Sequence, residues 1–235
     1  MYTRDLRSWV ELELKEGELF LAKTAYDLYF QDMLEATFYQ LLARLNKEKL
    51  LAKYAKGLYY KPYKNDFSRQ PEQDKIIDFL TDKSRKGMVI GPKMYADLQL
   101  IDDDVDYLYE VYTNKIEIKS VRVFNGIKVR TVDLDFKKDE LVRHIQMLEI
   151  IETIDDFENV NIRNLYKFLE LYTETFNQAD FLKVLAAKSY KKRNIAIVVD
   201  ILKAFGVKNT LSKLLNSASR YKKSDYIMQA INYGE

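Results

Sequence analysis

The sequence contains no cysteine and only one histidine among its 235 residues. Without cysteine there are no disulfides, thiolate zinc sites or cysteine nucleophiles, and the chain fits a reducing compartment. With His144 alone, a metal site built from several histidines is excluded, and so is a Ser-His-Asp triad with a spare base. Only 3 prolines and 7 glycines are present, which disfavours collagen-like chains and all-β folds rich in tight turns.

Long hydrophobic runs are also missing. No stretch approaches 18 uncharged apolar residues, so we expect no transmembrane helix and no membrane partner. The first 18 residues carry charges throughout and have no apolar segment typical of a signal peptide. We therefore expect a cytoplasmic protein.

Apolar and charged residues are both abundant. The chain is 47% hydrophobic, with 18 tyrosines and 12 phenylalanines, which is enough for a sizeable core in one or two domains. The net charge of +2 is unevenly distributed: residues 67–160 hold 14 basic and 20 acidic residues, whereas residues 161–235 hold 13 and 6. Within the first part, residues 31–64 hold 7 basic and 3 acidic residues. These two basic stretches could form an anion-binding surface or simply solvated helix faces.

The first sixty residues alternate helical and extended patterns. Apolar periodicity and turn residues predict helices over 3–15, 22–30 and 34–48, an extended piece at 18–21, and strands at 50–54 and 58–61 around a turn with Gly57. This order is that of a winged helix-turn-helix. A helix fits the major groove of DNA, and a basic hairpin can contact phosphates.

The polar face of the helix over 34–48 and the hairpin after it supply candidate DNA contacts. These are Thr37, Tyr39, Gln40, Arg44 and Lys47 on the helix, and Lys53, Tyr54, Lys56 and Lys61 in the hairpin. Winged helices also serve as protein-interaction modules, so an adaptor that never touches DNA is an alternative. Tyr59 is more simply interpreted as a core residue.

The rest of the chain predicts an α+β domain that is mainly helical. A polar linker at 63–71 separates a domain over 1–66 from one over 67–235. The expected order is a helix at 72–83, a strand at 87–90, a helix at 94–100, strands at 107–113, 116–124 and 127–132 with a hairpin turn at Asn125-Gly126, then helices at 139–154, 161–173, 178–187, 193–206, 209–219 and 224–232.

Several motifs resemble the antitoxins of the abortive-infection E (AbiE) family. GELFLAKTAYDLYF and FYQLLARLNKEKLLAKYAKGLYYKP match its N-terminal region at Phe20, Leu42, Arg44, Leu45, Gly57, Tyr59 and Pro62. The segments GPKMYADLQL, YEVYTNKIEI and VRVFNGIKVRTVDL occupy the places of later family elements, so the resemblance spans roughly residues 15–175. Lys49 and Gln99 stand where the family usually has glycine.

The resemblance implies an antitoxin of a toxin–antitoxin system for phage defence. Such a protein binds inverted repeats in its operator, represses its own operon and opposes a nucleotidyltransferase toxin, with self-association on DNA and a positive surface that spans both domains. Lys191, Lys192 and Arg193 would extend that surface, although cations at this place also suit a helix end. We expect no catalysis, no metal and no cofactor.

A metal-dependent nuclease fused to a winged helix is the competing interpretation. Asp104 or Asp106, followed by Glu117 and Lys119 on a strand, mimics the two carboxylates and the lysine of restriction-type nucleases. Glu-x-Lys is frequent in a chain with 31% charged residues, which weakens the match. His144 is interpreted as a surface or packing residue.

Overall fold

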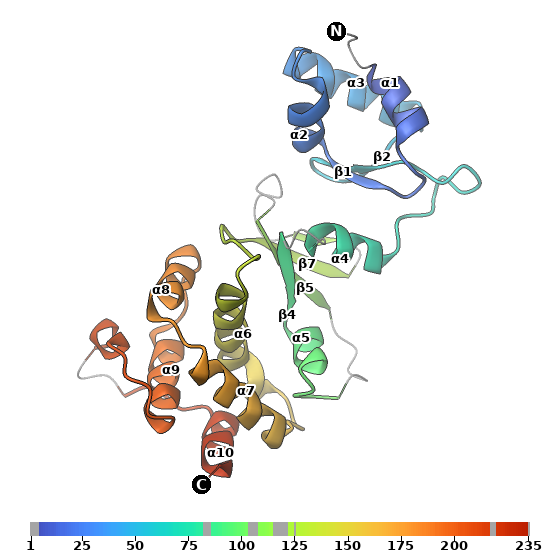
Figure 1. Ribbon diagram of the computed structural model, residues 1–235. Coiled ribbons are helices and arrows are strands. Elements are labelled where there is room, and N and C mark those ends of the chain that lie inside the picture. Colours follow the sequence, from blue (N-terminus) through green and yellow to red (C-terminus); the bar gives the residue numbers. More distant parts are fainter. Residues whose placement is uncertain are drawn as a thin grey trace.

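The computed structural model describes residues 5–81, 86–102, 108–114, 122–124, 126–216 and 220–234. Together they form an α+β protein in which helices predominate and two small sheets lie apart from each other (Figure 1). The α+β, mainly helical class predicted from the sequence agrees with this architecture. No helix in these ranges combines the length and the apolar character that a membrane span requires.

The N-terminal unit, residues 5–60, packs helices on one face of a three-stranded antiparallel sheet. Its elements are α1 (Leu6–Ser8) with a π-helical continuation (Trp9–Glu13), β1 (Leu19–Leu21), α2 (Ala22–Ala25) with another π-helical turn (Tyr26–Phe30), α3 (Glu35–Lys47), β2 (Ala52–Ala55) and β3 (Leu58–Tyr60). The strand order is β1-β3-β2. Trp9, Phe20, Phe38 and Leu42 belong to its buried core. Aromatic rings fill this core, and Trp9 meets Phe20 edge to face at 5.1 Å.

Several turns of the chain use residues with positive φ. Gly57, at φ +80° in the β2–β3 turn, has the conformation that the hairpin prediction required. Among the described non-glycine residues, positive φ occurs at Lys49 (60°) and Gln99 (56°). Each follows a helix, α3 and α5 (Pro92–Asp97) respectively, where a left-handed residue ends the helix.

The second sheet has four strands in the order β4-β5-β7-β6. β4 (Gly87–Ile90) and β6 (Arg122–Phe124) are antiparallel to their neighbours, whereas β5 (Tyr109–Thr113) and β7 (Ile127–Thr131) are parallel. In the predicted hairpin, Phe124 pairs with Ile127 and Gly126 has φ +75°, while Asn125 lies outside the described residues.

The helix α4 (Gln73–Thr81) lies between the two sheets (Figure 1). One buried cluster joins three surfaces: the far face of the N-terminal sheet, α4 and the second sheet. Its members are Leu19, Leu21, Leu58 and Tyr60, then Ile76 and Leu80, then Val111, Ile127 and Val129. The division of the chain at 66/67 stays a prediction, and this cluster crosses it.

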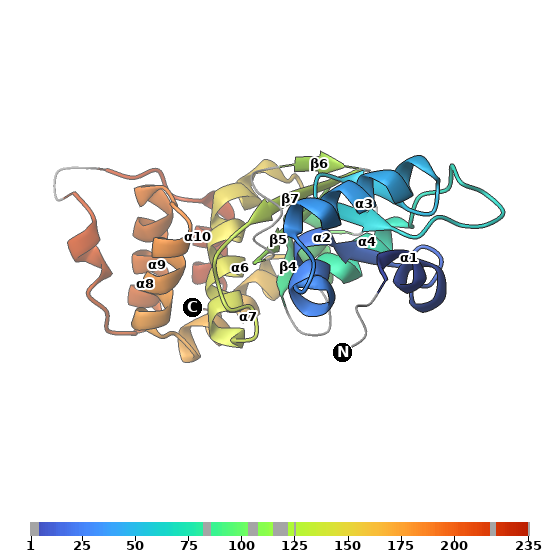
Figure 2. The ribbon, with the colours of Figure 1, turned by 90° about the horizontal axis from the view of Figure 1, so that it is seen from above.

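Five helices form the other end of the molecule, across the second sheet from the N-terminal unit (Figure 2). They are α6 (Asp139–Thr153), α7 (Ile162–Glu174), α8 (Gln178–Ala187), α9 (Lys192–Ala204) and α10 (Asp225–Tyr233). Side chains cap three of them: Asn161 accepts from Asn164 N, Asn177 from Ala179 N, and Ser224 from Ile227 N. Their apolar faces form the largest core of the protein.

One helix prediction was wrong. Residues 209–219 were expected to form a helix, but only a 3-10 turn at Leu211–Leu214 is present, and 217–219 lie outside the described residues. Asn209 Oδ1 accepts the Leu211 N–H at 3.1 Å, and the Gln178 side chain bonds both the N–H and the hydroxyl of Thr210 at 2.8 Å. These side-chain bonds satisfy backbone groups that a helix would otherwise use.

Candidate nucleic-acid interface

Small and polar residues alternate along the exposed face of α3. Phe38, Leu42 and Leu45 are buried, so they define the side of α3 that meets the core. At 100° per residue, the opposite side carries Ala36, Gln40, Ala43 and Lys47, all of them exposed. Two alanines allow a close approach to a flat or grooved partner, and Gln40 and Lys47 project from the same stripe.

Arg44 and Thr37 lie on one flank of this stripe rather than at its centre. Arg44 Nε donates to Glu48 Oε1 at 2.9 Å, and Arg7 from α1 bonds the other carboxylate oxygen. The bond from Arg44, together with that from Arg7, lowers the pKa of Glu48. Arg44 is nevertheless exposed on 71% of its side chain, so it can leave Glu48 for a phosphate.

Tyr39 lies on the opposite flank of α3, next to α2. Its ring is 38% exposed and meets Phe38 edge to face at 5.5 Å. Lys23 lies nearby, paired with Asp27 at 2.9 Å and with Glu35 at 3.7 Å. This flank is therefore electrically balanced, and the positive charge of the helix comes from Arg44 and Lys47.

The β2–β3 hairpin divides its predicted contacts between two faces. Lys53 and Lys56 are exposed, and Lys53 is paired across the strands with Tyr59. Tyr59 stacks on Phe20 at 5.9 Å and packs against the helical core, so its interpretation as a core residue is confirmed and Lys53 shares the helix side of the sheet. Tyr54 alternates to the other face, where it packs beside Tyr60 in the cluster around α4.

The side chain of Lys61 forms hydrogen bonds within the protein. Its Nζ donates to the carbonyl oxygens of Glu11 at 2.7 Å and Leu14 at 2.9 Å. These carbonyls end the first helical segment, where a cation satisfies both the free acceptors and the helix dipole. A phosphate contact by Lys61 would require these bonds to break.

The predicted basic cluster in the C-terminal half is tied into the fold to different extents. Lys191 pairs with Glu152, and Lys192 Nζ donates to Asn216 Oδ1 at 2.9 Å. Arg193 donates to the carbonyl oxygens of Lys222 at 3.0 Å and Ile151 at 3.1 Å, and to Asp155 Oδ2 at 3.0 Å. Its guanidinium therefore holds α9, the end of α6 and the segment before α10 together.

The two basic regions of the expected DNA surface lie far apart in the folded molecule. α3 and the hairpin are in the N-terminal unit, and α9 belongs to the helices beyond the second sheet (Figures 1 and 2).

The comparisons with known proteins leave the family open. No family model matches the chain, and no curated protein matches it. One solved structure resembles it: the crystal structure of the RV2827C protein from Mycobacterium tuberculosis, with 10% sequence identity, a TM-score of 0.41, and coverage of 97% of this chain and 92% of that one.

The predicted nuclease residues cannot be placed in the fold. Asp104, Asp106, Glu117 and Lys119 all lie outside the described residues. Within the described ranges, no group of three or more acidic or histidine side chains is arranged to hold a metal ion. His144 is 2% exposed and surrounded by Tyr172, Phe176 and Phe181, which confirms its interpretation as a packing residue.

One group of polar side chains was missed by the sequence patterns. The sequence patterns assigned no role to Glu110, Lys128 and Arg130, which line a cavity between the second sheet and α6. Glu149 and Lys188 complete its walls from the helical side. In the sequence, this site is indicated by the polar residues that alternate with apolar ones along β5 and β7.

Proposed function

We propose that the protein is a DNA-binding antitoxin that represses its own operon and opposes a nucleotidyltransferase toxin. The observation that carries the DNA-binding part is the stripe of Ala36, Gln40, Ala43 and Lys47 on α3, with Lys53 and Lys56 exposed on the neighbouring hairpin. Helix, strand, helix, helix and hairpin, with the strand order β1-β3-β2, suit a winged helix-turn-helix.

In this proposal α3 enters the major groove and the hairpin rests on the backbone. Gln40 can form a bidentate pair with adenine, and Lys47 and Arg44 can reach guanine or phosphate. Lys53 and Lys56 supply contacts that fix the protein on the duplex without reading sequence. Tyr54, Lys61 and Arg193, which have internal partners, contribute less than the sequence motifs predicted.

Operator binding tests the proposal through paired variants. Fluorescence anisotropy with the duplex upstream of the protein's own gene is compared with a shuffled duplex of equal length. Gln40→Ala should weaken specific binding by about 1–3 kcal/mol and leave the shuffled duplex unaffected, because the substitution removes a hydrogen bond to a base and none to a phosphate. Unchanged discrimination in both Gln40→Ala and Lys47→Ala would remove α3 from the reading role.

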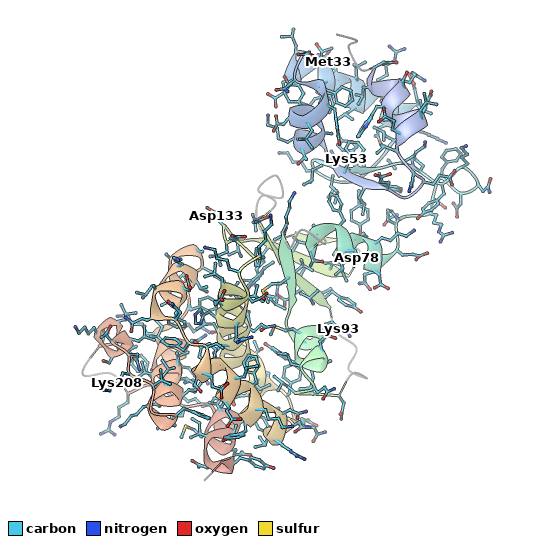
Figure 3. All side chains as sticks on the ribbon, viewed as in Figure 1. Met33, Lys53, Asp78, Lys93, Asp133 and Lys208 are labelled. Atoms are coloured by element: carbon cyan, nitrogen blue, oxygen red, sulfur yellow. The ribbon has the colours of Figure 1, made fainter. Side chains whose placement is uncertain are left out.

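Substitutions in the β2–β3 hairpin should change DNA binding in a different way. Lys53→Gln and Lys56→Gln should weaken binding to both duplexes and reduce the slope of log affinity against log salt by about 0.9 for each phosphate that is no longer neutralised. Lys208→Gln is the matched control, because Lys208 is exposed after α9 at the far end of the molecule from Lys53 (Figure 3). An equal slope change in the control would mean that net charge, not the hairpin, is responsible.

The antitoxin role is tested in cells. The protein is expressed together with the product of the reading frame beside its gene. If that frame encodes a nucleotidyltransferase toxin that stops growth, co-expression of the protein should restore growth. Rescue by a Gln40→Ala, Lys53→Gln double variant would separate antitoxicity from operator binding. Failure of the intact chain to rescue would contradict this half of the proposal.

A further inference from the structure

In the second sheet, β5 and β7 turn polar side chains toward the helices. In the parallel pair β5–β7, Glu110 lies opposite Lys128 and Tyr112 opposite Arg130. The alternate residues Val111, Ile127 and Val129 are fully buried on the side of α4. A sheet face covered by helices is usually apolar, because buried polar groups need partners. Two strands here place four polar side chains where a core would be expected.

These side chains line a cavity of about 490 Å³. Its other walls come from α6, through Glu149 and Glu152, and from the segment between α8 and α9, through Lys188 and Tyr190. This volume lies within the range of sites that hold small molecules. The walls combine aromatic rings with a few convergent charges, which is the usual composition of such sites.

Most of the charges in the cavity are already neutralised. Lys128 Nζ donates to Glu110 Oε1 at 2.7 Å, and Lys191 pairs with Glu152. Glu149, 8% exposed, accepts on one oxygen from Lys188, from Tyr190 at 2.8 Å and from Tyr112 at 3.0 Å. The remaining wall carboxylate, Asp156, is exposed at the edge.

Tyr112 and Tyr190 stay protonated in this setting. Burial and the neighbouring Glu149 raise the pKa of both hydroxyls. Lys188 lies over both rings, at 4.9 Å from the centroid of Tyr112 and 4.1 Å from that of Tyr190. Three donors thus converge on one oxygen, Oε1, of Glu149.

Arg130 is the wall cation that lacks a hydrogen-bond acceptor for its Nε within the described part of the chain. Its Nε is buried and has no hydrogen-bond acceptor among the residues that the structure describes. A buried donor without an acceptor is unfavourable, and a charged one more so. A guanidinium presents a planar fork of donors that matches a carboxylate or a phosphate. Arg130 is therefore a cation in the cavity wall whose buried Nε donor has no acceptor in the described ranges.

We propose that this cavity binds a small organic anion, a carboxylate or a phosphate ester, whose charged group pairs with Arg130 and whose body packs against the tyrosine rings. The inference is independent of DNA binding by the N-terminal unit. Because the cavity is bounded by the sheet, by α6 and by the α8–α9 segment, an occupied site would hold these elements together. The ligand would therefore stabilise the folded chain.

Arginine side-chain NMR tests this proposal on the intact protein. With ¹⁵N-labelled arginine, the Nε–Hε signal of Arg130 is assigned by its loss in Arg130→Gln. Inorganic phosphate and benzoate are then titrated separately to tens of millimolar, with chloride at matched ionic strength as the reference. We expect a saturable shift of the Arg130 signal with at least one probe. Response to phosphate alone identifies a phosphate ligand, and response to benzoate alone identifies a carboxylate on a flat body.

Thermal unfolding supplies the second readout. The responding probe should raise the Tm of the wild type and of Arg163→Gln, an exposed arginine on α7, but not that of Arg130→Gln. An Arg130 signal that neither probe moves beyond the chloride reference would overturn the proposal. So would an equal rise of Tm in Arg130→Gln, because the anion would then bind elsewhere. If Arg130→Gln does not fold, the Arg130 signal is assigned by its loss in Arg130→Lys. The titration of the wild type then tests the proposal.

Discussion

The single histidine makes one pH dependence of this protein unusually simple to isolate. His144 on α6 is 2% exposed, and its Nδ1 lies 3.2 Å from the Tyr172 hydroxyl. Burial lowers its pKa from 6.5 to about 4, partly opposed by a backbone hydrogen bond at Asn177 and by Asp180 and Glu140, and supported by Arg143. The folded protein therefore keeps the imidazole neutral at pH values where the unfolded chain protonates it.

The sign and size of the effect follow from these two pKa values. A depressed pKa in the folded state gives stability that is complete above the unfolded pKa of about 6.5 and is lost as the pH falls toward 4. Between pH 7 and pH 5 the folded state should lose about 2 kcal/mol relative to the unfolded state, out of a full loss of about 3 kcal/mol below pH 4. Carboxyl groups titrate mostly below this interval, so His144 dominates it.

Urea unfolding at several pH values, followed by far-ultraviolet circular dichroism, measures this loss. His144→Asn and His144→Leu should each be less stable at pH 7, yet their stability should change little between pH 7 and pH 5. The same slope in wild type and variants would refute the reasoning. The ¹H NMR signal of the lone imidazole gives a direct check, because it should not titrate until the pH is well below 6.

Three further predictions concern the hydrogen bonds of Arg193 and the backbone at Lys49, Gln99 and Gly87. Arg193→Met should lower the free energy of unfolding by about 2 kcal/mol, because it removes the donor from the carbonyl oxygens of Lys222 and Ile151 and from Oδ2 of Asp155; urea titration measures it. Lys49→Gly and Gln99→Gly should each stabilise the protein by about 0.5–1 kcal/mol, since both residues have positive φ, and a fall in Tm would contradict this. Gly87→Ala should cost more than about 2 kcal/mol in the same titration, because its Cβ would lie 2.7 Å from the Leu80 carbonyl oxygen and closer still to that of Tyr112.

The periodic parts of the fold could be predicted from the sequence. Apolar spacing predicted α6 at 139–154, and the helix covers Asp139–Thr153 because its buried face follows a regular pattern of large apolar residues. Gly57 predicted the β2–β3 turn for the same local reason, since the residue type and the required φ agree. Local patterns were least informative at residues 209–219, where side chains distant in sequence compete for the backbone.

The role of a charged side chain was much harder to predict. Alternation in β7 shows that Lys128 and Arg130 share a face, but it does not show that α6 covers that face. Arg193 was expected to bind DNA as part of a basic run, and its acceptors at Ile151 and Asp155 lie about forty positions earlier in the chain. Only the tertiary structure separates a lysine that is free to meet a phosphate, such as Lys53, from a cation that holds helices together.

The cluster around α4 has a practical consequence for anyone who works with the N-terminal unit alone. A chain that ends at residue 66 would present Leu19, Leu21, Leu58 and Tyr60 to water on one sheet face, beside the open edge of β2. An apolar face next to an open strand edge favours association of the sheet with other copies. A fragment that ends after α4, at residue 81, would carry its own cover for that face. The shortest well-behaved DNA-binding fragment should therefore be sought there.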